Sequence, residues 1–480
     1  MVKITDSKGA INKTRTGGSG RVIVIIMLVS AVVCVTVPGP ANVEAQSQPL
    51  YRISSYSAGL SPSTAKIGDL DQDGLHDIAV AGLQGSLQLF FNNGRGSFDR
   101  VSLNSLWPAG SSAPGLDIGD LNGDARNDIA VAYPTERGAV AVLFNQGNRT
   151  FTSPVSYDVC SSSRGVSIGD LDQDGDNDLA DISRCFRSGI LLNNGHSGFT
   201  LNGTYGDGND SRSIALADFN RDGFKDIAYL NKGLGNVTVM LNNRNATFAA
   251  PVWHYAGDLP DDLAVGDFDG DGNTDIAIAN SYLSLVILLL NDSQGNFPGY
   301  SELGAGDTPT SIVPADLNGD RLLDIAVTSP GGNTLSTIIN LGGYNFSSPR
   351  TISVGQSPVD IASGNLDGDS LPDLVTVNQS SGSITVLSSA AGATPPPPPP
   401  AEIKLTVSTR STSKARLADL RWSGATSSRI DIYRNGSRIT TVSNTGGYTD
   451  QFARRATGTF RYKVCGAGTQ TCSNEASVSF

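Results

Sequence analysis

The chain repeats one pattern of apolar and polar segments with a period of about 50 residues. Each unit has a short apolar segment such as 214–217, then an acidic loop, then an alternating run such as 275–279. Two further segments close the unit, as in 237–243 and 247–255. Alternation with a period of two is typical of strands, and no helical stripe separates the loops. Four strands per unit of this length predict one blade of a β-propeller.

The acidic loop is the most regular part of the unit and occurs seven times. The copies are DLDQDGLHD at 69–77, DLNGDARND at 120–128, DLDQDGDND at 170–178, DFNRDGFKD at 218–226, DFDGDGNTD at 267–275, DLNGDRLLD at 316–324 and NLDGDSLPD at 365–373. Successive copies start 51, 50, 48, 49, 49 and 49 residues apart. This spacing predicts an all-β, seven-bladed β-propeller over residues 46–390.

The two ends of the repeat array predict a closed ring. After the seventh loop only two apolar runs remain, at 374–378 and 383–389, so the last blade lacks a fourth strand. Residues 51–62 resemble residues 350–358 and supply a candidate for it. We expect this N-terminal strand to complete the last blade, because closure removes the open edge that an array would leave.

The first 45 residues differ from the rest in composition. Five basic residues precede an uninterrupted apolar run at 22–37, which is short for a bilayer span of about 20 residues. We interpret residues 1–45 as a secretory signal peptide cleaved after Ala45, with an uncleaved anchor as the alternative. The mature protein is then expected to be secreted or held at the cell surface, with no membrane span.

A second, smaller domain is predicted at the C-terminus. The proline-rich residues 391–402 form a stiff linker, and residues 403–480 contain about seven short alternating segments that predict a β-sandwich. Trp422, Tyr433 and Tyr462 resemble the core aromatics of fibronectin type III-like modules. Trp422 ends an apolar strand, so we assign it to the core and not to stacking on a sugar.

Charge and cysteine content limit the classes of partner and the cellular compartment. The net charge of -12 argues against nucleic acid, whose binders need a basic face. Four cysteines remain beyond the predicted signal, which favours disulfides in an oxidising compartment. Cys465 and Cys472 are close enough to bridge a hairpin, and Cys160 and Cys185 flank one acidic loop.

Oxygen ligands at alternate positions of each loop predict a site for a hard divalent cation. Positions one, three, five and nine are Asp or Asn, and position seven offers a backbone carbonyl. Calcium accepts six to eight such ligands, whereas magnesium requires a stricter octahedron and keeps its waters. An EF-hand is excluded, because position twelve is never the Glu that this motif requires and the flanks alternate as strands.

The seven units resemble FG-GAP/VCBS repeats, the blades of integrin-alpha-type propellers, across residues 50–390. The resemblance implies that each acidic loop joins the first two strands of a blade and binds calcium, with up to seven ions in all. The residues at the ligand positions are Asp69, Asp71, Asp73, Leu75, Asp77, Asp120, Asn122, Asp124, Arg126, Asp128, Asp170, Asp172, Asp174, Asp176, Asp178, Asp218, Asn220, Asp222, Phe224, Asp226, Asp267, Asp269, Asp271, Asn273, Asp275, Asp316, Asn318, Asp320, Leu322, Asp324, Asn365, Asp367, Asp369, Leu371 and Asp373.

The loops differ at position six, where a sharp turn favours glycine. Four copies have glycine there, and the other three have Ala125, Arg321 and Ser370. A left-handed conformation costs such residues on the order of 1 kcal/mol. The seventh loop also opens with Asn365, which lacks a charge. We therefore expect loops two, six and seven to bind calcium more weakly than the other four.

If the calcium ions only stabilise the blades, we expect partner binding to use loops other than the acidic ones. Integrin-type propellers are understood to bind partners on the face opposite the calcium, which here includes the connections at 107–108, 205–210 and 258–262. Trp107 is the best single candidate for a contact residue, but packing inside a blade is the interpretation we favour for it. The expected function is a calcium-stabilised binding or adhesion module for glycans or an extracellular protein.

Catalysis has little support in the sequence. The three histidines, His76, His196 and His254, are scattered, and no nucleophile or phosphate-binding motif stands at a strand-to-helix turn. An extracellular polysaccharide hydrolase or lyase on the same scaffold is the alternative function. A structural component without a soluble ligand is the third.

Overall fold

The computed structural model describes residues 51–389 and 403–480 with internal gaps at 95–96, 109–113, 135–137, 160–161, 184–187, 207–209, 413–414, 424–428 and 468–471. Within the predicted signal segment it describes β1 (Val24–Leu28) and β2 (Ala31–Val35), an antiparallel pair. The remainder of that segment, its expected cleavage point and the linker at 391–402 lie outside the described residues. Among the residues with a described conformation, no helix is long and apolar enough to cross a bilayer.

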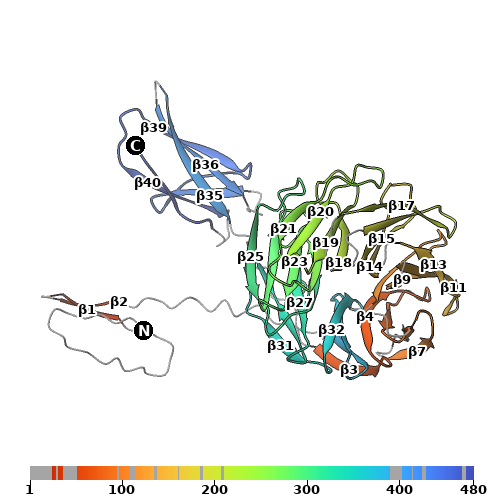
Figure 1. The fold of residues 1–480 in the computed structure, drawn as a ribbon. Coiled ribbons are helices and arrows are strands. Elements are labelled where there is room, and N and C mark those ends of the chain that lie inside the picture. The colour runs from red at the N-terminus through yellow and green to blue at the C-terminus, as the bar shows by residue number, and fades with distance from the viewer. Residues whose placement is uncertain are drawn as a thin grey trace. The chain divides into compact units, whose positions relative to one another are not determined.

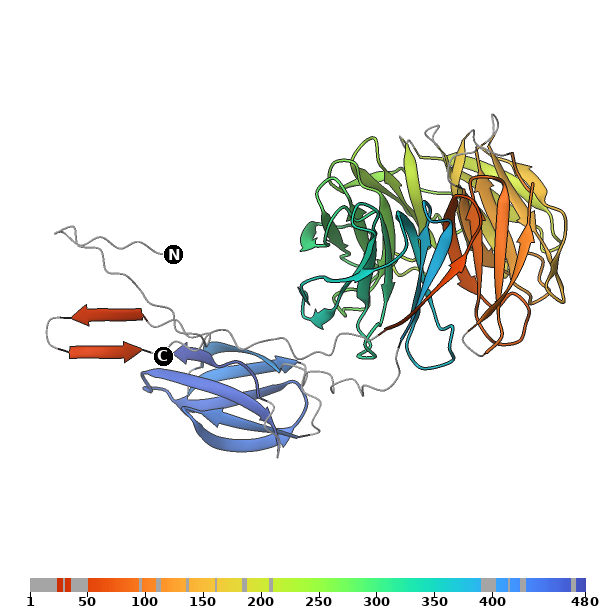
Figure 2. The same ribbon diagram turned by 90° about the horizontal axis from the view of Figure 1, so that it is seen from below.

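Seven four-stranded antiparallel sheets form the blades of a propeller around a common centre (Figure 1, Figure 2). Blades one to three contain β4 (Pro62–Gly68), β5 (Asp77–Gly82), β6 (Ser86–Asn92) and β7 (Phe98–Leu103); β8 (Gly115–Gly119), β9 (Asp128–Tyr133), β10 (Ala139–Leu143) and β13 (Val155–Asp158); and β14 (Ser163–Gly169), β15 (Asp178–Ser183), β16 (Ser188–Asn193) and β17 (Phe199–Tyr205). Short pairs, β11 (Asn145–Gly147) with β12 (Thr150–Phe151) and β29 (Asn340–Gly342) with β30 (Asn345–Phe346), extend blades two and six.

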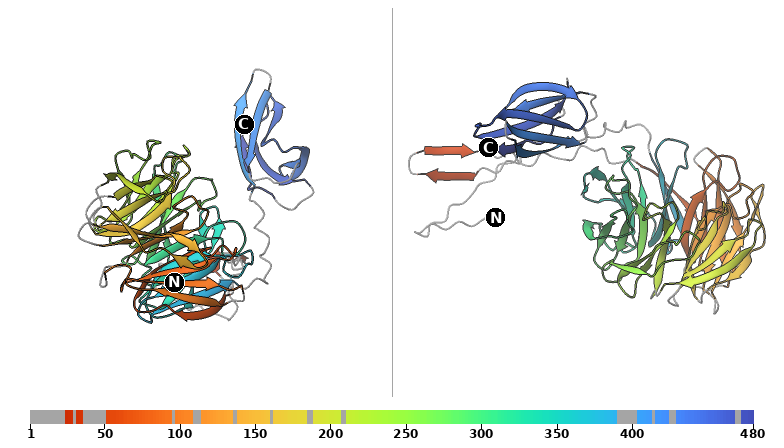
Figure 3. Two further views of the ribbon diagram at one scale, coloured as in Figure 1. Left: turned by 90° about the vertical axis from the view of Figure 1, so that its right-hand side faces the viewer. Right: turned by 90° about the horizontal axis from the view of Figure 1, so that it is seen from above.

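The remaining four blades have the same construction (Figure 3). They contain β18 (Ser211–Ala217), β19 (Asp226–Asn231), β20 (Asn236–Met240) and β21 (Val252–Tyr255); β22 (Asp262–Gly266), β23 (Asp275–Asn280), β24 (Leu285–Leu290) and β25 (Gly299–Gly304); β26 (Ser311–Ala315), β27 (Asp324–Ser329), β28 (Thr334–Ile338) and β31 (Arg350–Ser353); and β32 (Pro358–Gly364), β33 (Asp373–Asn378), β34 (Ser383–Ser389) and β3 (Tyr51–Ser57).

The ring closes through the N-terminal strand, as predicted. β3 pairs with β34 along its whole length, from Tyr51 opposite Ser389 to Ser57 opposite Ser383. The first strand of blade seven, β32, also contacts the first strand of blade one, β4. Without β3 the hydrogen-bonding edge of β34 would be open, so the two ends of the repeat array hold each other.

The core of the propeller lies between neighbouring blades. The second strand of every blade is buried along its entire length, from β5 in blade one to β33 in blade seven. Its side chains pack on both faces of the sheet, so its sequence is apolar almost throughout, as in Ile276-Ala-Ile-Ala279. At the closing junction Val80 of blade one and Val375 of blade seven share one apolar cluster.

The antiparallel order divides the connections between two faces of the ring. Acidic loops join the first and second strands, and they share a face with the turns between the third and fourth strands. We call this the acidic face. Turns between the second and third strands share the other face with the connections from one blade to the next. We call this the opposite face.

The C-terminal domain is a β-sandwich of two sheets. Its strands are β35 (Lys404–Ser411), β36 (Ala415–Ser423) and β39 (Gly447–Ala453) in one sheet, and β38 (Ser437–Ser443), β37 (Arg429–Arg434), β40 (Thr459–Gly466) and β41 (Ala476–Ser479) in the other. Trp422 and Tyr462 are buried in its core, as expected, and Tyr462 donates to Asp450 at 2.7 Å. Tyr433 is only half-buried and lies outside that core.

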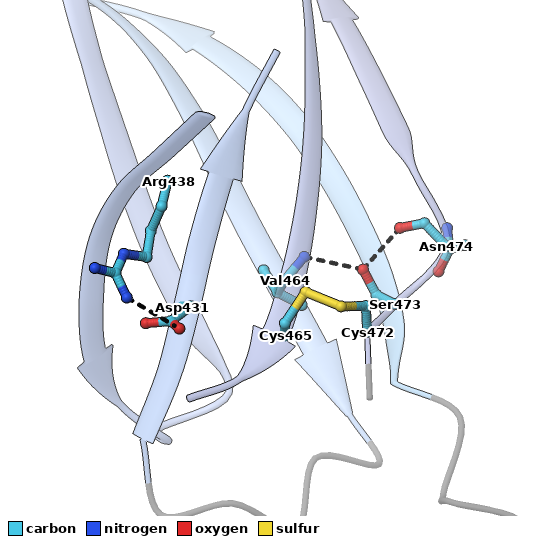
Figure 4. Close-up of a disulfide and its surroundings, with 7 residues drawn as sticks. All are labelled: Asp431, Arg438, Val464, Cys465, Cys472, Ser473 and Asn474. Atoms are coloured by element: carbon cyan, nitrogen blue, oxygen red, sulfur yellow. Dashed lines mark hydrogen bonds and ion pairs between the residues drawn. A yellow bond between two sulfur atoms is a disulfide. The ribbon is translucent and has the colours of Figure 1, made fainter. Parts of the chain in front are cut away.

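The predicted disulfide of this domain is present. Cys465, near the end of β40, is bonded to Cys472 (Figure 4). Ser473 also joins the segment after Cys472 to β40. Its hydroxyl accepts the N–H of Val464 at 3.1 Å and donates to the carbonyl of Asn474 at 2.7 Å. The other predicted pair, Cys160 and Cys185, lies outside the described residues.

Candidate metal centres

Acidic loop one, between β4 and β5, shows how each copy is built. Asp69 accepts the backbone N–H of Gln72 at 2.7 Å and that of Gly74 at 3.1 Å, which closes the turn. Asp73 accepts the N–H of Leu75 at 2.8 Å. The aspartates at positions one and five are therefore oriented by the backbone of their own loop.

The turn places two residues in the left-handed conformation, at positions four and six. Position six has a positive φ in loops one to six, including Ala125 at 62° and Arg321 at 71°. Position four has a positive φ in all seven loops, and it is Gly123, Gly270, Gly319 or Gly368 in four of them. For loops two and six, the ranking predicted above depends on position six alone.

This second position changes the predicted ranking of the loops. Loops two and six lack glycine at position six, but they have it at position four. Loops one, three and four carry the opposite arrangement, with Gln72, Gln173 and Arg221 in the left-handed conformation. Each of these five loops thus has one non-glycine residue in the left-handed conformation, so glycine content does not separate loops two and six from loops one, three and four, and their weaker binding stays a prediction.

Loop seven differs because an amide stands at position one. Asn365 accepts the N–H of Gly368 at 2.7 Å with its single oxygen, and its amide nitrogen donates to the carbonyl of Asp369. In the other six loops the second carboxylate oxygen at position one accepts the N–H of position six. That acceptor is missing here, and Ser370 is not left-handed. The expected departure of loop seven has a structural basis.

The aspartate at position nine is fully buried in every blade. In loop one Asp77 accepts the N–H of Leu70 at 2.8 Å and that of Asn92 at 2.7 Å. Burial raises the pKa of the carboxyl at this position, and the two N–H bonds act in the opposite direction. The pKa is raised to about 6 in Asp128, Asp226 and Asp373, to about 7 in Asp77, Asp178 and Asp275, and to about 8 in Asp324.

An asparagine at or just after the end of the third strand links each acidic loop to the next blade. In blade two Asn145 donates to the carbonyl of Leu70 in loop one at 2.9 Å and to that of Asn127 in its own loop at 3.0 Å. The equivalent residues are Asn92, Asn193, Asn242, Asn291 and Asn340. Asparagines recur at this point of the repeat, as in LLNN at 191–194 and MLNN at 240–243, and this recurrence is the sequence signal for their role.

Blade seven is the exception to this interblade link. Ser389 stands where the other blades have asparagine, and its hydroxyl donates to Asp369 of its own loop at 3.1 Å. Its backbone N–H still reaches the buried Asp373 at 2.7 Å. Among the described residues, the junction between blades six and seven therefore lacks the side-chain link that the other six junctions have.

The loops present oxygen atoms in the arrangement that a hard cation requires. Three carboxylates of loops one, three and five have oxygens within 4.8 Å of one another, so one ion can contact all of them. The groups are Asp69, Asp71 and Asp77; Asp170, Asp172 and Asp178; and Asp267, Asp269 and Asp271. Loops two, four and six have Asn122, Asn220 and Asn318 at position three, so they offer one carboxylate fewer. The donor set fits calcium.

Residues from the next blade reach two of these loops at position three. Arg149, in the turn between β11 and β12, donates from Nε to Asp71 of loop one at 2.7 Å. Tyr344, in the matching turn of blade six, donates to Asp269 of loop five, a bond that raises the pKa of the Tyr344 hydroxyl. Position three is therefore a contact between blades as well as a candidate ligand.

The opposite face does not present the residue that the sequence singled out. Trp107 is buried in the apolar cluster between blades one and two, and its ring stacks on Tyr133 with centroids 6.2 Å apart. A contact role for Trp107 is wrong, and the favoured packing interpretation is confirmed. The connection at 258–262 is held by Asn280, which donates to the carbonyl of Asp258 at 3.0 Å. Part of the connection at 205–210 lies outside the described residues.

The first strands of the blades line a central cavity of about 620 Å3. Two carboxylates in its wall, Asp262 and Asp360, lie 2.8 and 2.9 Å from the hydroxyl of Ser311. Asp360 also accepts the N–H of Ala65 at 2.8 Å, and Asp262 accepts that of Ile312 at 3.1 Å. Burial raises the pKa of both carboxyls. Both residues join their own strand to the first strand of the next blade.

The three histidines lie on separate elements. His76 belongs to acidic loop one, and the exposed His196 lies in a turn of blade three. His254, on β21, packs against Phe297 with ring centroids 5.0 Å apart, and burial lowers its pKa. None of them is brought beside the carboxylates of the central cavity.

The family comparison matches the acidic loops and the strands that follow them. An FG-GAP-like repeat is found at residues 69–131, 120–180, 218–278, 267–327 and 316–376, and these stretches cover more than half of the chain. Each stretch runs from one acidic loop into the second strand of the next blade. The chain belongs to the FG-GAP-like repeat family. The repeat unit thus includes the asparagine that links neighbouring blades.

Solved structures agree with the propeller fold of this FG-GAP-like chain. The crystal structure of BBS1N in complex with ARL6DN, soaked with mercury, matches with a TM-score of 0.52 and 13% identity over 72% of this chain and 99% of that chain. The lead-soaked crystal matches with a TM-score of 0.51 and 13% identity over 73% and 100%. At this identity the likeness shows the fold alone. No curated protein matches the chain.

Proposed function

We propose that this FG-GAP-like propeller is a calcium-stabilised binding or adhesion module that acts outside the cell, secreted or at the cell surface. The proposal rests on one observation: the repeated acidic residues are engaged within the propeller, whereas the segments that differ between blades are not part of the repeated loops. The repeated carboxylates of the acidic face are held by their own loops and by neighbouring blades. The outer strands and the connections between blades do not repeat in sequence, and they remain available to a partner.

Calcium is the ion proposed for the acidic loops, with up to seven sites. The carboxylates at positions one, three, five and nine would hold it, and the carbonyl at position seven would complete the set. Isothermal titration of the calcium-free protein tests this assignment. We expect calcium to bind with a stoichiometry of at least three, because three loops have a group of three carboxylates close enough to share one ion. Equal binding of magnesium would overturn the choice of ion.

A glycan or an extracellular protein is the proposed partner. A glycan array combined with an assay for release of reducing ends tests the glycan arm. Binding without product supports a binding module, whereas turnover supports the alternative, an extracellular polysaccharide hydrolase or lyase. The observation that favours the alternative is the pair Asp262 and Asp360 in the central cavity. If turnover is found, Asp262→Asn and Asp360→Asn should each abolish it.

The C-terminal sandwich is proposed to be fibronectin type III-like and to act as a spacer or docking module. Three strands face four, in the order β35-β36-β39 and β38-β37-β40-β41, around the buried Trp422 and Tyr462. The predicted signal peptide and the disulfide between Cys465 and Cys472 support an oxidising, extracellular setting. Mass determination of the secreted protein tests the predicted cleavage after Ala45.

A further inference from the structure

Exposed apolar side chains concentrate in one sector of the propeller. Twelve large apolar side chains are exposed among the described residues, and eight of them fall between residues 201 and 300. The sector also contains four of the five exposed aromatic residues, Trp253, Tyr255, Tyr282 and Tyr300. The seven repeats do not account for this bias, because their outer strands are otherwise mostly polar. An exposed cluster of this kind marks a candidate interaction surface.

Three of these rings form a strip across the outer strands of blades four and five. Trp253 and Tyr255 are two residues apart on β21, so they point to the same face of their strand. Tyr300, on β25, lies with its ring centroid 5.3 Å from that of Tyr255. The strip of Trp253, Tyr255 and Tyr300 therefore crosses the boundary between the two blades.

Paired strands hold the strip in place. Trp253 stands opposite Thr238 on β20, and Tyr300 stands opposite Leu289 on β24, each within a continuous antiparallel ladder. Between the two exposed rings of β21, His254 points inward and packs on Phe297. Each residue of the strip is nevertheless about half exposed, at 56% for Trp253, 50% for Tyr255 and 52% for Tyr300. The rings are preorganised and contribute little to the core.

The charged residues near the strip indicate which class of ligand it can bind. No Lys or Arg occurs between residues 245 and 320. Acidic polysaccharides, nucleic acids and anionic lipids therefore meet no cationic Lys or Arg from this stretch of the chain, and the nearby Lys232 is paired with Asp261. Asp261 pairs with Lys232, Asp262 lines the central cavity and the carboxylates of loop five belong to the candidate metal centre, whereas Glu302, on the same face of β25 as Tyr300, is exposed and adds a negative charge beside the strip.

We propose that the strip of Trp253, Tyr255 and Tyr300 binds an uncharged polysaccharide. The C–H faces of pyranose rings stack on the exposed aromatic faces, and the two tyrosine hydroxyls hydrogen-bond to sugar hydroxyls. A strip that joins two blades suits an extended chain in which successive sugars contact successive rings. The inference rests on the proposed binding function and assigns it to one surface and one ligand class.

The test uses affinity gel electrophoresis of the full chain in calcium. The neutral probes are hydroxyethylcellulose, arabinoxylan and galactomannan, and carboxymethylcellulose is the charged counterpart of the first. At least one neutral polymer should retard the protein, and Trp253→Ala and Tyr300→Ala should each weaken that binding at least tenfold. Leu60→Ala removes the most exposed apolar side chain of the described chain, at 78%, and should leave binding unchanged.

Tryptophan fluorescence gives a second readout. The chain has three tryptophans, and Trp107 and Trp422 are buried at 4% and 6% exposure, so Trp253 accounts for quenching by acrylamide. The neutral polymer that retards the protein should protect it from quenching. Loss of this protection in Tyr300→Ala, which keeps Trp253 as the reporter, would support the assignment, and full protection in that variant would contradict it.

The outcomes separate this inference from the proposed function. If a neutral polysaccharide binds and the strip variants bind equally well, the strip is overturned and the binding function stands. Preference for carboxymethylcellulose or for a cationic protein overturns the ligand class. If no polysaccharide binds but an extracellular protein does, the inference fails alone. If neither binds, both the inference and the proposed function fail.

Discussion

The acidic face and the strip on blades four and five are built in opposite ways. The acidic face repeats one nine-residue pattern of Asp and Asn seven times, and its side chains bond to their own loops and to neighbouring blades. The strip occurs once, breaks the pattern of polar outer strands and leaves its rings exposed. Residues that repeat around the ring hold it together, and residues that depart from the repeat give this propeller its individual surface.

This comparison gives a rule for reading mutations. A change on the acidic face should alter the free energy of unfolding and leave polysaccharide binding intact as long as the protein is folded. A change in the strip should do the reverse. The rule fails if, in any of the following tests, the free energy of unfolding and polysaccharide binding change together while the protein remains folded.

After the removal of calcium itself, the largest effect is expected from pH in the calcium-free protein. The folded state raises the pKa of the seven position-nine carboxyls from the ordinary 3.8 to about 6–8. Protons thus bind the folded chain more tightly than the unfolded chain, and stability is lost as the pH rises through this range. The melting temperature of calcium-free protein should be higher at pH 6 than at pH 8 by roughly 5 °C or more. With saturating calcium the order should reverse, because the ion competes with the proton.

Asp275→Ala should have the largest effect of a single substitution. The buried carboxylate accepts the N–H groups of Phe268 at 3.0 Å and Asn291 at 2.8 Å. Its removal leaves two buried donors without a partner and should cost about 2–5 kcal/mol in the free energy of unfolding. Urea denaturation in calcium measures the loss. Asp307→Ala, which removes an exposed carboxylate of the same sector, is the control and should change little.

The link between blades should be separable from its neighbour in sequence. Asn242 is buried and donates to the carbonyls of Leu171 at 2.7 Å and Lys225 at 3.0 Å. The next residue, Asn243, is exposed and its side chain donates to Thr247 at 3.1 Å. Asn242→Ala should cost about 1–3 kcal/mol, whereas Asn243→Ala should cost a few tenths. Equal losses would contradict a role for Asn242 in joining the blades.

Loop seven offers the smallest change with a predicted gain. Asn365→Asp restores the oxygen that accepts the position-six N–H in the other six loops, and it adds one charge to the candidate site. Calcium affinity at this loop should rise about tenfold, because affinity follows the charge of the ligand set. Titration of calcium into the wild type and the variant measures the gain. Asp69→Asn in loop one should give the reverse, and an unchanged isotherm for both would refute the effect.

The periodic elements could be predicted from the sequence. Four apolar segments per unit predict four strands, and the resemblance of 51–62 to 350–358 places the closing strand. β3 does pair with β34. These predictions succeed because burial of the second strand of each blade imposes the same apolar pattern at every copy.

Three-dimensional neighbours could not be predicted in the same way. Asn92 bonds to the carbonyl of Leu366, 274 residues away, and only the closed ring brings them together. Trp107 was the candidate contact residue, with packing the favoured role, and only the structure shows that Tyr133 of the next blade stacks on it. The exposure of Trp253 could not be predicted either, because the alternation of a strand does not show which of its residues the adjacent blade leaves uncovered.

The central claim is that cations in the acidic loops hold the blades together, and chelation tests it most directly. The 24 carboxylates at positions one, three, five and nine repel one another when no ion is present. The melting temperature of the full chain should therefore be measured at pH 7.5 in excess calcium and again in EDTA. We predict a fall of roughly 10 °C or more on chelation, reversed by added calcium. The same melting temperature in both conditions would contradict the account.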